Sequence, residues 1–588
     1  MAAQLAGAVD ITLSHSSGRP WLLARTNTGR LVTHNRGNLH IALAGATSAT
    51  SSDLEQVGKS VRTPGDLAAV SRRIPGSYCV LGSADGIVYA AGPAMETRKI
   101  FYASINGVCI AADRADVLAE LGGFGIDAAT LALRLVRALP YPCGEIPLWR
   151  QVESVAGGDY VTIQRDGVSV SRRRWWHRPE QTMSRAEGAE GLRHAIQQAV
   201  RSRVIAGEPM ACDLSGGLDS TPLCFFAAQE PGGVLARTLY NDDPGGREDL
   251  DWALRALKSM PGVHTHITFS TDEMPDFYEG LANVRVRFDE PTRAATAGPR
   301  IQQLLTDDGA RGIRTHINGL GGDHLLRGLR GWEHTLMRSR PLLAWRRARA
   351  EDVPGGVGPL TTLSRLLDRR SYSQWFRDTL HNSINGVQPP RAPRTNDWSA
   401  PLGLPPWLTD EARAAVVRKL RDIADRAEPL AADLAGHLDV FTLRDAGRLI
   451  RSTGQIGHPL GVAYEAPLVD DHVVEIALAV RREERDSPLE WKPLMKAAMK
   501  DLLPDDFLRR TSKVGGAPQS VRGYAAHYDS LMALCEESGL SASGLIDMKR
   551  LSEATKPDSK STPSDHIHET IDAAIFLRNS ENLVLSPA

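Results

Sequence analysis

The sequence predicts a mixed fold with two main domains: an α+β layer domain over residues 1–178 and an α/β domain over residues 179–588. Two observations predict this division. Before about residue 178, short alternating apolar and polar runs are separated by Gly, Asn and Asp turns. After it, apolar runs alternate with amphipathic helical stretches. At about 150 residues per domain, a length of 588 residues suits three or four folding units, and two large ones are also plausible.

The N-terminal strands are expected in four stretches, at 19–35, 84–92, 98–113 and 157–176, each with turn residues at its bends. Residues 112–121 read as a short helix capped by Asp113. Together these elements predict a layered structure of sheets and few helices.

The C-terminal elements begin with a long amphipathic helical stretch at 184–207. Strands are expected just before 215, at 232–241, at 263–270 and at 310–323, with helices between them. This alternation is typical of a doubly wound, mostly parallel sheet covered by helices on both faces. The region 330–430 reads as a helical, Arg-rich insertion interrupted by Pro.

The composition excludes several classes of protein. Apolar residues make up 42% and charged residues 24%, as in average globular chains. The formal charge of −1 gives no global attraction to nucleic acid, and no run of about 18 uncharged apolar residues predicts a membrane span. The first residues lack the basic and apolar regions of a signal peptide, and the six Cys are scattered without CxxC pairs. We therefore expect a cytoplasmic protein with reduced thiols and no nucleic-acid partner.

The strongest motif is the loop from Ser215 to Ser220, which reads SGGLDS. It follows an apolar run and opens a helix over 221–229, so that unpaired backbone N–H groups can bind an oxyanion. Gly216 and Gly217 permit close approach of a phosphate. Asp219 would repel phosphate directly but can hold Mg²⁺ against it. The pattern is not the GxxxxGK[ST] loop, and a tight turn without a ligand is the alternative interpretation.

This loop resembles the pyrophosphate loop of ATP-dependent synthetases related to asparagine synthetase B, which cleave ATP between the α- and β-phosphates and form an acyl-adenylate. Further segments resemble the same family's acidic loop, acidic-proline segment and basic C-terminal turn: 316–328, 461–472 and 491–513. Segments before the loop resemble its glutamine amidotransferase domain: 75–78, 111–113, 157–160 and 175–176.

The resemblance implies an N-terminal, degenerate glutaminase-like sandwich of the Ntn type, and a C-terminal sheet of the PP-loop ATP pyrophosphatase type with added helices. It implies ATP and Mg²⁺ as cofactors, with Asp219 and Asp323 as metal ligands. Lys513 would stabilise the oxyanion and the pyrophosphate charge, and Glu465 would act as a further catalytic residue. The implied ATP-binding residues are Leu214, Ser215, Gly216, Gly217, Leu218, Asp219, Ser220, Leu239, Tyr240, Gly319, Gly321, Gly322 and Asp323.

Two departures from the family bear on the substrate. The family's glutaminase uses an N-terminal Cys, but Ala2 stands at the second position here, so glutamine is not the expected amine source. Leu320 replaces an acidic residue of asparagine synthetases, which suits a nucleophile that is already partly neutral. A peptide α-amine, with a pKa of about 7.7–8.0, is such a nucleophile.

Lasso peptide cyclases also lack the glutaminase Cys, and residues 321–323 and 140–145 are similar to theirs. This resemblance implies a macrolactam synthetase that adenylates an Asp or Glu side chain of a core peptide and joins it to the peptide's N-terminal amine. Expected partners are the precursor peptide, a leader-peptide-binding protein and a cysteine protease. An ammonia-dependent asparagine synthetase, a β-lactam synthetase-like enzyme and a non-catalytic binding protein remain as alternatives.

The basic residues of the insertion have two interpretations. We expect a solvated helix face, and alternatively a docking site for an acidic peptide or partner protein. The residues concerned are Arg338, Arg340, Arg346, Arg347 and Arg349.

Overall fold

The structure is a computed structural model. It describes residues 9–15, 17–25, 30–241, 244–327, 331–387, 393–511, 517–557, 567–580 and 585–586.

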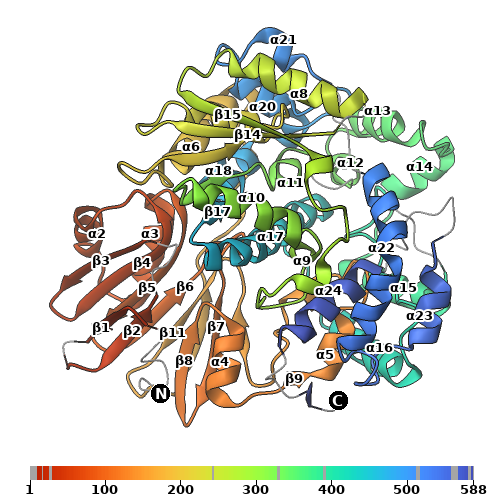
Figure 1. Ribbon diagram of the computed structural model, residues 1–588. Coiled ribbons are helices and arrows are strands. Elements are labelled where there is room, and N and C mark those ends of the chain that lie inside the picture. The colour runs from red at the N-terminus through yellow and green to blue at the C-terminus, as the bar shows by residue number, and fades with distance from the viewer. Residues whose placement is uncertain are drawn as a thin grey trace.

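The N-terminal part contains two antiparallel sheets that pack face to face (Figure 1). The larger sheet has the order β12-β11-β6-β5-β4-β3, with the bounds Val170–Arg174, Asp159–Ile163, Ile87–Ala91, Gly76–Ala84, Leu39–Thr47 and Leu31–Arg36. The smaller has the order β10-β7-β8, with the bounds Glu153–Val155, Ile100–Ile105 and Val108–Ala112. A small core that includes Cys79, Tyr102 and Val161 fills the space between them.

Helices cover the outer faces of these sheets. On the larger sheet lie α2 (Ser51–Gly58) and α3 (Ala68–Arg73), and on the smaller lies α4 (Ala115–Gly122). A capping box at Thr50, whose hydroxyl accepts from the amide of Asp53, starts α2. The expected sandwich of sheets is therefore present as a helix–sheet–sheet–helix layering. The short hairpin of β1 (Ile11–Ser14) and β2 (Pro20–Ala24) forms a separate two-stranded sheet, which contacts the larger sheet through a 2.9 Å hydrogen bond between His15 and Ser83.

The C-terminal part is built on a five-stranded parallel sheet with the order β15-β14-β13-β16-β17. The strands have the bounds Val263–Ser270, Val234–Tyr240, Met210–Asp213, Thr315–Ile317 and Ala463–Glu465. The chain adds β14 and β15 on one side of β13 and then returns to add β16 on the other. Right-handed crossovers place the helices of these two halves on opposite faces of the sheet. The mixed α/β class with a parallel C-terminal sheet is confirmed.

The helices of the first face are α6 (Arg185–Arg201), α7 (Ser220–Ala227), α8 (Pro244–Leu257), α18 (Asp471–Ala479) and α20 (Pro493–Ala498). On the other face, α10 (Gly298–Ala310) packs against the long α17 (Leu434–Gly457), as Figure 1 shows. Most of α17 is buried, in keeping with its position between the sheet and the neighbouring helices.

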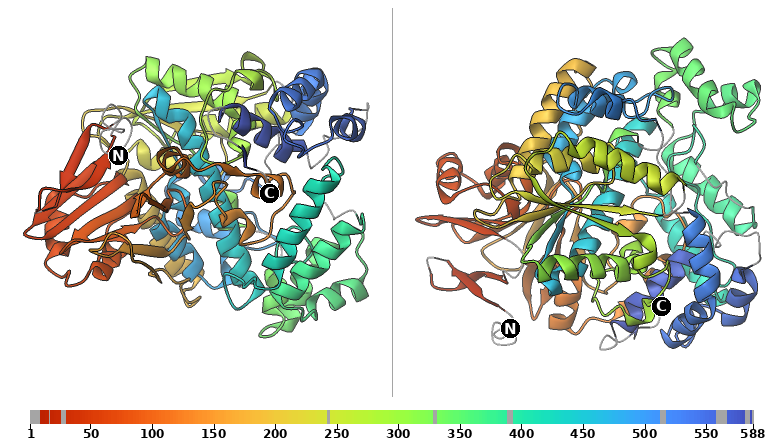
Figure 2. Two further views of the ribbon diagram at one scale, coloured as in Figure 1. Left: turned by 90° about the horizontal axis from the view of Figure 1, so that it is seen from below. Right: turned by 45° about the horizontal axis from the view of Figure 1, so that its top comes forward.

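The chain between β16 and β17 is helical. It contains α12 (Trp332–Leu336), α13 (Pro341–Asp352), α14 (Pro359–Leu366), α15 (Tyr372–Ile384) and α16 (Asp410–Ala424). The C-terminal helices α22 (Ala517–Glu537), α23 (Met548–Thr555) and α24 (Ile567–Arg578) pack beside it (Figure 2).

The expected solvated Arg face on α13 is only partly correct. Arg338, Arg340 and Arg346 are exposed, but Arg347 and Arg349 are not. Arg347 donates to the backbone carbonyls of Glu483 and Asp486, and its guanidinium lies over Trp332. These two Arg side chains therefore hold the helices together.

The N-terminal and C-terminal parts share buried cores. One large core joins β4, β5 and β6 to α6, α7 and α18. A second core joins α4, α5 (Ala128–Leu133) and the 131–152 segment to α15, α16, α22 and α24. In addition, the last described residues form β18 (Leu585–Ser586), which pairs with β9 (Ile126–Asp127). The two parts are thus joined along much of their length.

In the part of the chain that the structure describes, none of the helices combines the length and the apolar character needed to span a bilayer.

Candidate functional site

The glycine-rich loop lies where β13 ends and α7 begins, at the carboxyl edge of the parallel sheet. The hydroxyls of Ser215 and Ser220 lie 2.8 Å apart, and the amide of Ser215 donates to the Ser220 oxygen over 3.0 Å. These bonds close the loop on itself, so that its shape exists before any ligand binds. The loop lies between β13 and β16, the point at which the strand order reverses, where open α/β sheets bind their ligands.

A basic residue ties the far segment of the chain to this loop. Gly216 has φ +68°, and a Cβ there would lie 2.5 Å from the carbonyl oxygen of Asp249, so only Gly fits. The guanidinium of Arg510 donates to the carbonyl of Gly216 over 2.7 Å and forms an ion pair with Asp249. Arg510 therefore fixes the chain beside the loop three residues before Lys513. Lys513 itself lies outside the described residues.

The two predicted metal ligands, Asp219 and Asp323, lie on either side of one ammonium group. Lys492 Nζ lies 2.5 and 2.6 Å from the two carboxylate oxygens of Asp219 and 2.6 Å from an oxygen of Asp323. Lys492 is 1% exposed and Asp219 8%, whereas the Asp323 side chain is 60% exposed. The pair is therefore buried on one side and open to solvent on the other.

Lys492 was not among the predicted site residues, although it opens the 491–513 segment that resembles the family's basic end. It precedes α20 and has φ +45°, a conformation that non-Gly residues seldom adopt. The signal available in the sequence was a Lys directly before a Pro-started helix, which does not reveal what the Lys faces.

The donor set fits Mg²⁺. Both carboxylates already converge on a single positive charge, and Mg²⁺ prefers carboxylate oxygens. The backbone is close to this pair as well, because a Cβ on Gly322 would lie 2.2 Å from an Asp219 oxygen.

A charged cluster of His316, Asp308 and Asp213 lies next to the start of the glycine-rich loop. His316 lies on β16 and bridges two carboxylates: Nδ1 is 2.6 Å from an Asp308 oxygen, and Nε2 is 3.0 Å from an Asp213 oxygen. Burial alone would lower the pKa of His316, but its bonds to these two carboxylates outweigh that effect and raise it to about 9. His316 is therefore a charged imidazolium at neutral pH and links β16 to Asp213, the last residue of β13.

Glu465, predicted as a catalytic residue, lies at the end of β17 next to the 319–323 loop. Its backbone carbonyl accepts from the amide of Asn318 over 2.9 Å. Its carboxylate pairs with Arg203 at 3.1 Å and with Arg98 at 3.1 Å. Arg203 also forms two 2.7 Å bonds to Asp470. The carboxylate is thus held by one Arg from each half of the chain, an arrangement that fixes its position.

The remaining predicted ligand-binding residues line the same edge of the sheet. Leu214 follows β13, and its amide donates to the carbonyl of Arg237 over 2.7 Å. Leu239 and Tyr240 end β14, and Gly319 follows β16. A Cβ on Gly319 would lie 2.8 Å from the amide nitrogen of Ser220, so the two loops are in direct contact.

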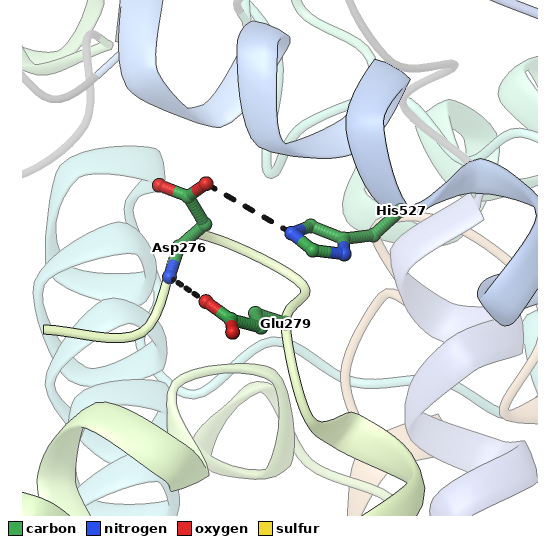
Figure 3. A group of neighbouring side chains, drawn as sticks. All are labelled: Asp276, Glu279 and His527. Atoms are coloured by element: carbon green, nitrogen blue, oxygen red, sulfur yellow. Dashed lines mark hydrogen bonds and ion pairs between the residues drawn. The ribbon is translucent and has the colours of Figure 1, made fainter.

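A further group of polar side chains lies on α22 and the segment after β15 (Figure 3). His527 Nε2 is 3.9 Å from an Asp276 oxygen, and the amide of Asp276 donates to Glu279 over 2.7 Å. Glu279 also lines a cavity of about 690 Å³ between β15 and α10. The Asp276–His527 ion pair connects the segment after β15 to α22.

The parallel sheet carries a self-closed glycine-rich loop at its switch point, and beside it two carboxylates share the ammonium group of Lys492. These features define a class of α/β proteins suited to phosphorylated ligands. Within that class, the chain belongs to the asparagine synthase family, whose characteristic domain it matches over residues 191–573.

The match to an individual protein covers less of the chain than the match to the family domain. The chain is 26% identical over 168 residues to glutamine-hydrolysing asparagine synthetase 1 of Saccharomyces cerevisiae, a match that covers 23% of this chain and 29% of that protein. The chain thus matches less than a third of the length of this curated relative.

Two solved structures of purine-related enzymes overlap with the fold only weakly. One is described as an allosteric regulatory enzyme of purine biosynthesis (9% identity, TM-score 0.18, covering 42% of this chain and 63% of that one). The other is the glutamine phosphoribosylpyrophosphate amidotransferase of B. subtilis (10% identity, TM-score 0.18, covering 42% and 64%). At this TM-score neither similarity bears on function.

Proposed function

We propose that this chain is an ATP-dependent carbon–nitrogen ligase that releases AMP and pyrophosphate, and that it closes a macrolactam in a peptide as lasso peptide cyclases do. The observation that carries the ligase proposal is the placement of Asp219 and Asp323 around the ammonium group of Lys492, beside a self-closed glycine-rich loop at the N-terminus of α7. Membership in the asparagine synthase family supports it.

In the first step, the amides of the 215–220 loop bind the phosphates, and a substrate Asp or Glu carboxylate attacks the α-phosphorus of ATP. The bond to the β-phosphate oxygen breaks, pyrophosphate leaves, and an acyl-adenylate forms. Mg²⁺ bound by Asp219 and Asp323 would offset the negative charge of the departing pyrophosphate. Arg510, bonded to the loop at Gly216, holds the loop in place during this step.

In the second step, the peptide's own N-terminal amine attacks the acyl carbon. AMP leaves, the amine loses a proton, and an isopeptide bond remains, so that the peptide loses one water in total. Lys513 is proposed to stabilise the oxyanion; one such donor commonly contributes about 3–4 kcal/mol. Glu465, fixed between Arg98 and Arg203, is proposed to line the site on the side of β17.

Leu320 favours a peptide amine over ammonia as the nucleophile. Leu320, in the loop beside Asp323, packs against the apolar core, so this position offers no carboxylate to an incoming amine. An α-amine with a pKa of about 7.7–8.0 is partly unprotonated without such help.

An asparagine synthetase activity is the second candidate, because the curated relative with a matching segment is an asparagine synthetase. This activity would use the same adenylation step and free ammonia as the nucleophile. A β-lactam synthetase-like ring closure on a small amino acid is a further form of the same chemistry.

The test measures pyrophosphate release and product mass with three substrate sets: candidate precursor peptides, aspartate with ammonium, and small amino-acid carboxylates. The proposal expects a peptide product lighter by one water, with turnover lowered about a hundredfold or more in Lys513→Ala. Formation of asparagine with no peptide product would refute the cyclase proposal and support the second candidate. A small-carboxylate product would likewise refute it.

The proposed pathway partners are a precursor peptide, a leader-peptide-binding protein and a cysteine protease. Open reading frames that encode a short peptide and a small protease beside this gene would support them. A neighbourhood of primary amino-acid metabolism would contradict them.

A further inference from the structure

The helical hairpin formed by α13 and α14 carries a concentration of exposed apolar side chains. Five of the ten exposed large apolar residues in the described part of the chain lie within residues 337–370: Leu342 (81% exposed), Val353 (57%), Leu360 (81%), Leu363 (37%) and Leu367 (55%). Three of them, at 360, 363 and 367, follow the spacing of a single helix face. Such clustering marks an interaction surface more often than scattered single residues do.

The same segment is strongly basic. Residues 337–370 contain eight Arg and three acidic residues (Glu351, Asp352 and Asp368), a net charge of +5, whereas the whole chain has −1. Arg338, Arg346 and Arg369 are exposed alongside the apolar side chains. Arg340 and Arg370 form ion pairs at 3.0 Å with Glu483 and Asp378, which lie outside the segment, so the positive potential of the surface rests on the three exposed Arg side chains.

The hairpin is preformed rather than loosely attached. Arg349 donates to the carbonyl of Val357 over 2.6 Å and to the Thr362 hydroxyl over 3.0 Å. The Thr362 hydroxyl in turn donates to buried Asp352 over 2.7 Å. Because α13 and α14 are already fixed to each other, a partner would not have to order them on binding.

The hairpin projects at the edge of the molecule, beyond α12 (Figures 1 and 2). It follows the site closely along the chain, since Pro341 comes 18 positions after Asp323. A partner bound to the hairpin would therefore contact the segment that follows the 319–323 loop in the sequence.

We propose that this surface, residues 337–370, docks an acidic polypeptide that presents an amphipathic helix, its apolar face on Leu360, Leu363 and Leu367 and its carboxylates on the Arg residues. Charge complementarity selects this occupant. A second copy of the chain would bring the exposed Arg338, Arg346 and Arg369 of the two copies against each other across a symmetric interface. An anionic membrane, which basic helices with exposed Leu also bind, is the competing occupant that the vesicle measurement below tests.

The test uses the full-length protein and a fluorescently labelled, acidic amphipathic peptide of about six helical turns, with Leu on one face and Glu on the other. Its charge-reversed twin carries Lys in place of Glu. Fluorescence anisotropy should show micromolar binding of the acidic peptide, at least tenfold weaker binding of the twin, and weakening in about 0.3 M salt. Equal binding of both peptides, or no binding of either, would overturn the proposal.

Variants locate the binding. The double variant Leu360→Ser/Leu367→Ser should weaken binding at least tenfold, and Arg346→Glu/Arg369→Glu should abolish the preference for the acidic peptide. Leu489→Ser is the matched control, since Leu489 is 76% exposed and lies outside the hairpin. An equal loss in the control would refute the assignment.

Two further measurements distinguish the competing occupants. Sedimentation with vesicles of phosphatidylcholine and phosphatidylglycerol should leave the protein in the supernatant; co-sedimentation lost in Leu360→Ser/Leu367→Ser would replace the proposal with membrane binding. Light scattering should show a mass independent of concentration; self-association abolished by the same variant would replace it with a dimer interface.

Discussion

Lys492→Met tests whether one buried ammonium holds the two carboxylates of the site together. The substitution keeps an unbranched side chain, so packing and the φ of +45° change little, but it removes the positive charge. The Asp219 carboxylate, 8% exposed and bonded at 2.5 and 2.6 Å to Lys492 Nζ, then loses this ion pair.

The expected cost comes almost entirely from Asp219. Breaking a buried ion pair by removing one partner typically costs about 3–5 kcal/mol, because a buried charge is left uncompensated. The Asp323 side chain is 60% exposed, so solvent replaces most of what it loses. We therefore expect the free energy of unfolding to fall by about 3 kcal/mol in buffer without divalent cations.

Added Mg²⁺ should reverse much of this loss, because the ammonium no longer competes for the carboxylates. At about 100 times its Kd, a bound ion contributes about 2.7 kcal/mol. The assay is urea unfolding followed by fluorescence, with and without Mg²⁺, in wild type, Lys492→Met and the control Lys500→Met on exposed Lys500. A stability within about 1 kcal/mol of wild type, or the same Mg²⁺ response in all three proteins, would refute this reasoning.

Three further predictions follow from the geometry of the site. His316 has a pKa raised to about 9, so its pairing stabilises the fold fully below about pH 6.5, and stability is lost as the pH rises through 9. His316→Asn should flatten this loss of about 3 kcal/mol in urea unfolding across pH 6.5–9.5, and an unchanged slope would contradict it. Arg98→Ala should lower the kcat of ATP-dependent pyrophosphate release about tenfold, because Glu465 then keeps only Arg203 of the two Arg side chains that hold its carboxylate, and Arg98→Lys should restore most of the activity. Equal activity in all three proteins would exclude this positioning role. Gly322→Ala brings a Cβ to 2.2 Å from an Asp219 oxygen and should lower the free energy of unfolding by about 1–3 kcal/mol. The control is Gly358→Ala, whose Cβ meets no atom within 4 Å. Equal melting temperatures of the two variants would count against the close contact.

The features that the sequence predicts well are local ones. The SGGLDS loop, its apolar strand and its helix are contiguous, so their geometry follows from a short stretch of chain. The parallel sheet is likewise predictable from the alternation of strands and helices. Asp219 and Asp323 lie on such loops, and in the structure both contact the ammonium group of Lys492.

The features that the sequence does not reveal depend on contacts between distant residues. Lys492 and Asp219 are 273 positions apart, and Arg98 and Glu465 are 367 apart. A basic residue read in sequence gives no sign of which carboxylate it faces, or whether it faces solvent. For the same reason Arg347 and Arg349 were expected on a solvated face, although the fold uses them as internal hydrogen-bond donors. Lys513 lies outside the described residues, so its role stays a prediction.

The shared cores and the Arg98–Glu465 ion pair have a consequence for how this protein can be divided or recombined. Cutting the chain near residue 178 would expose apolar surface on both fragments. It would also leave charged side chains within that surface without the partners they have in the whole protein. Neither fragment should fold alone, and grafting a glutaminase-bearing N-terminal half from a relative should yield an insoluble chimera. An evolutionary loss of glutamine hydrolysis should therefore leave the first half in place, because the apolar surface of the second half is buried against it.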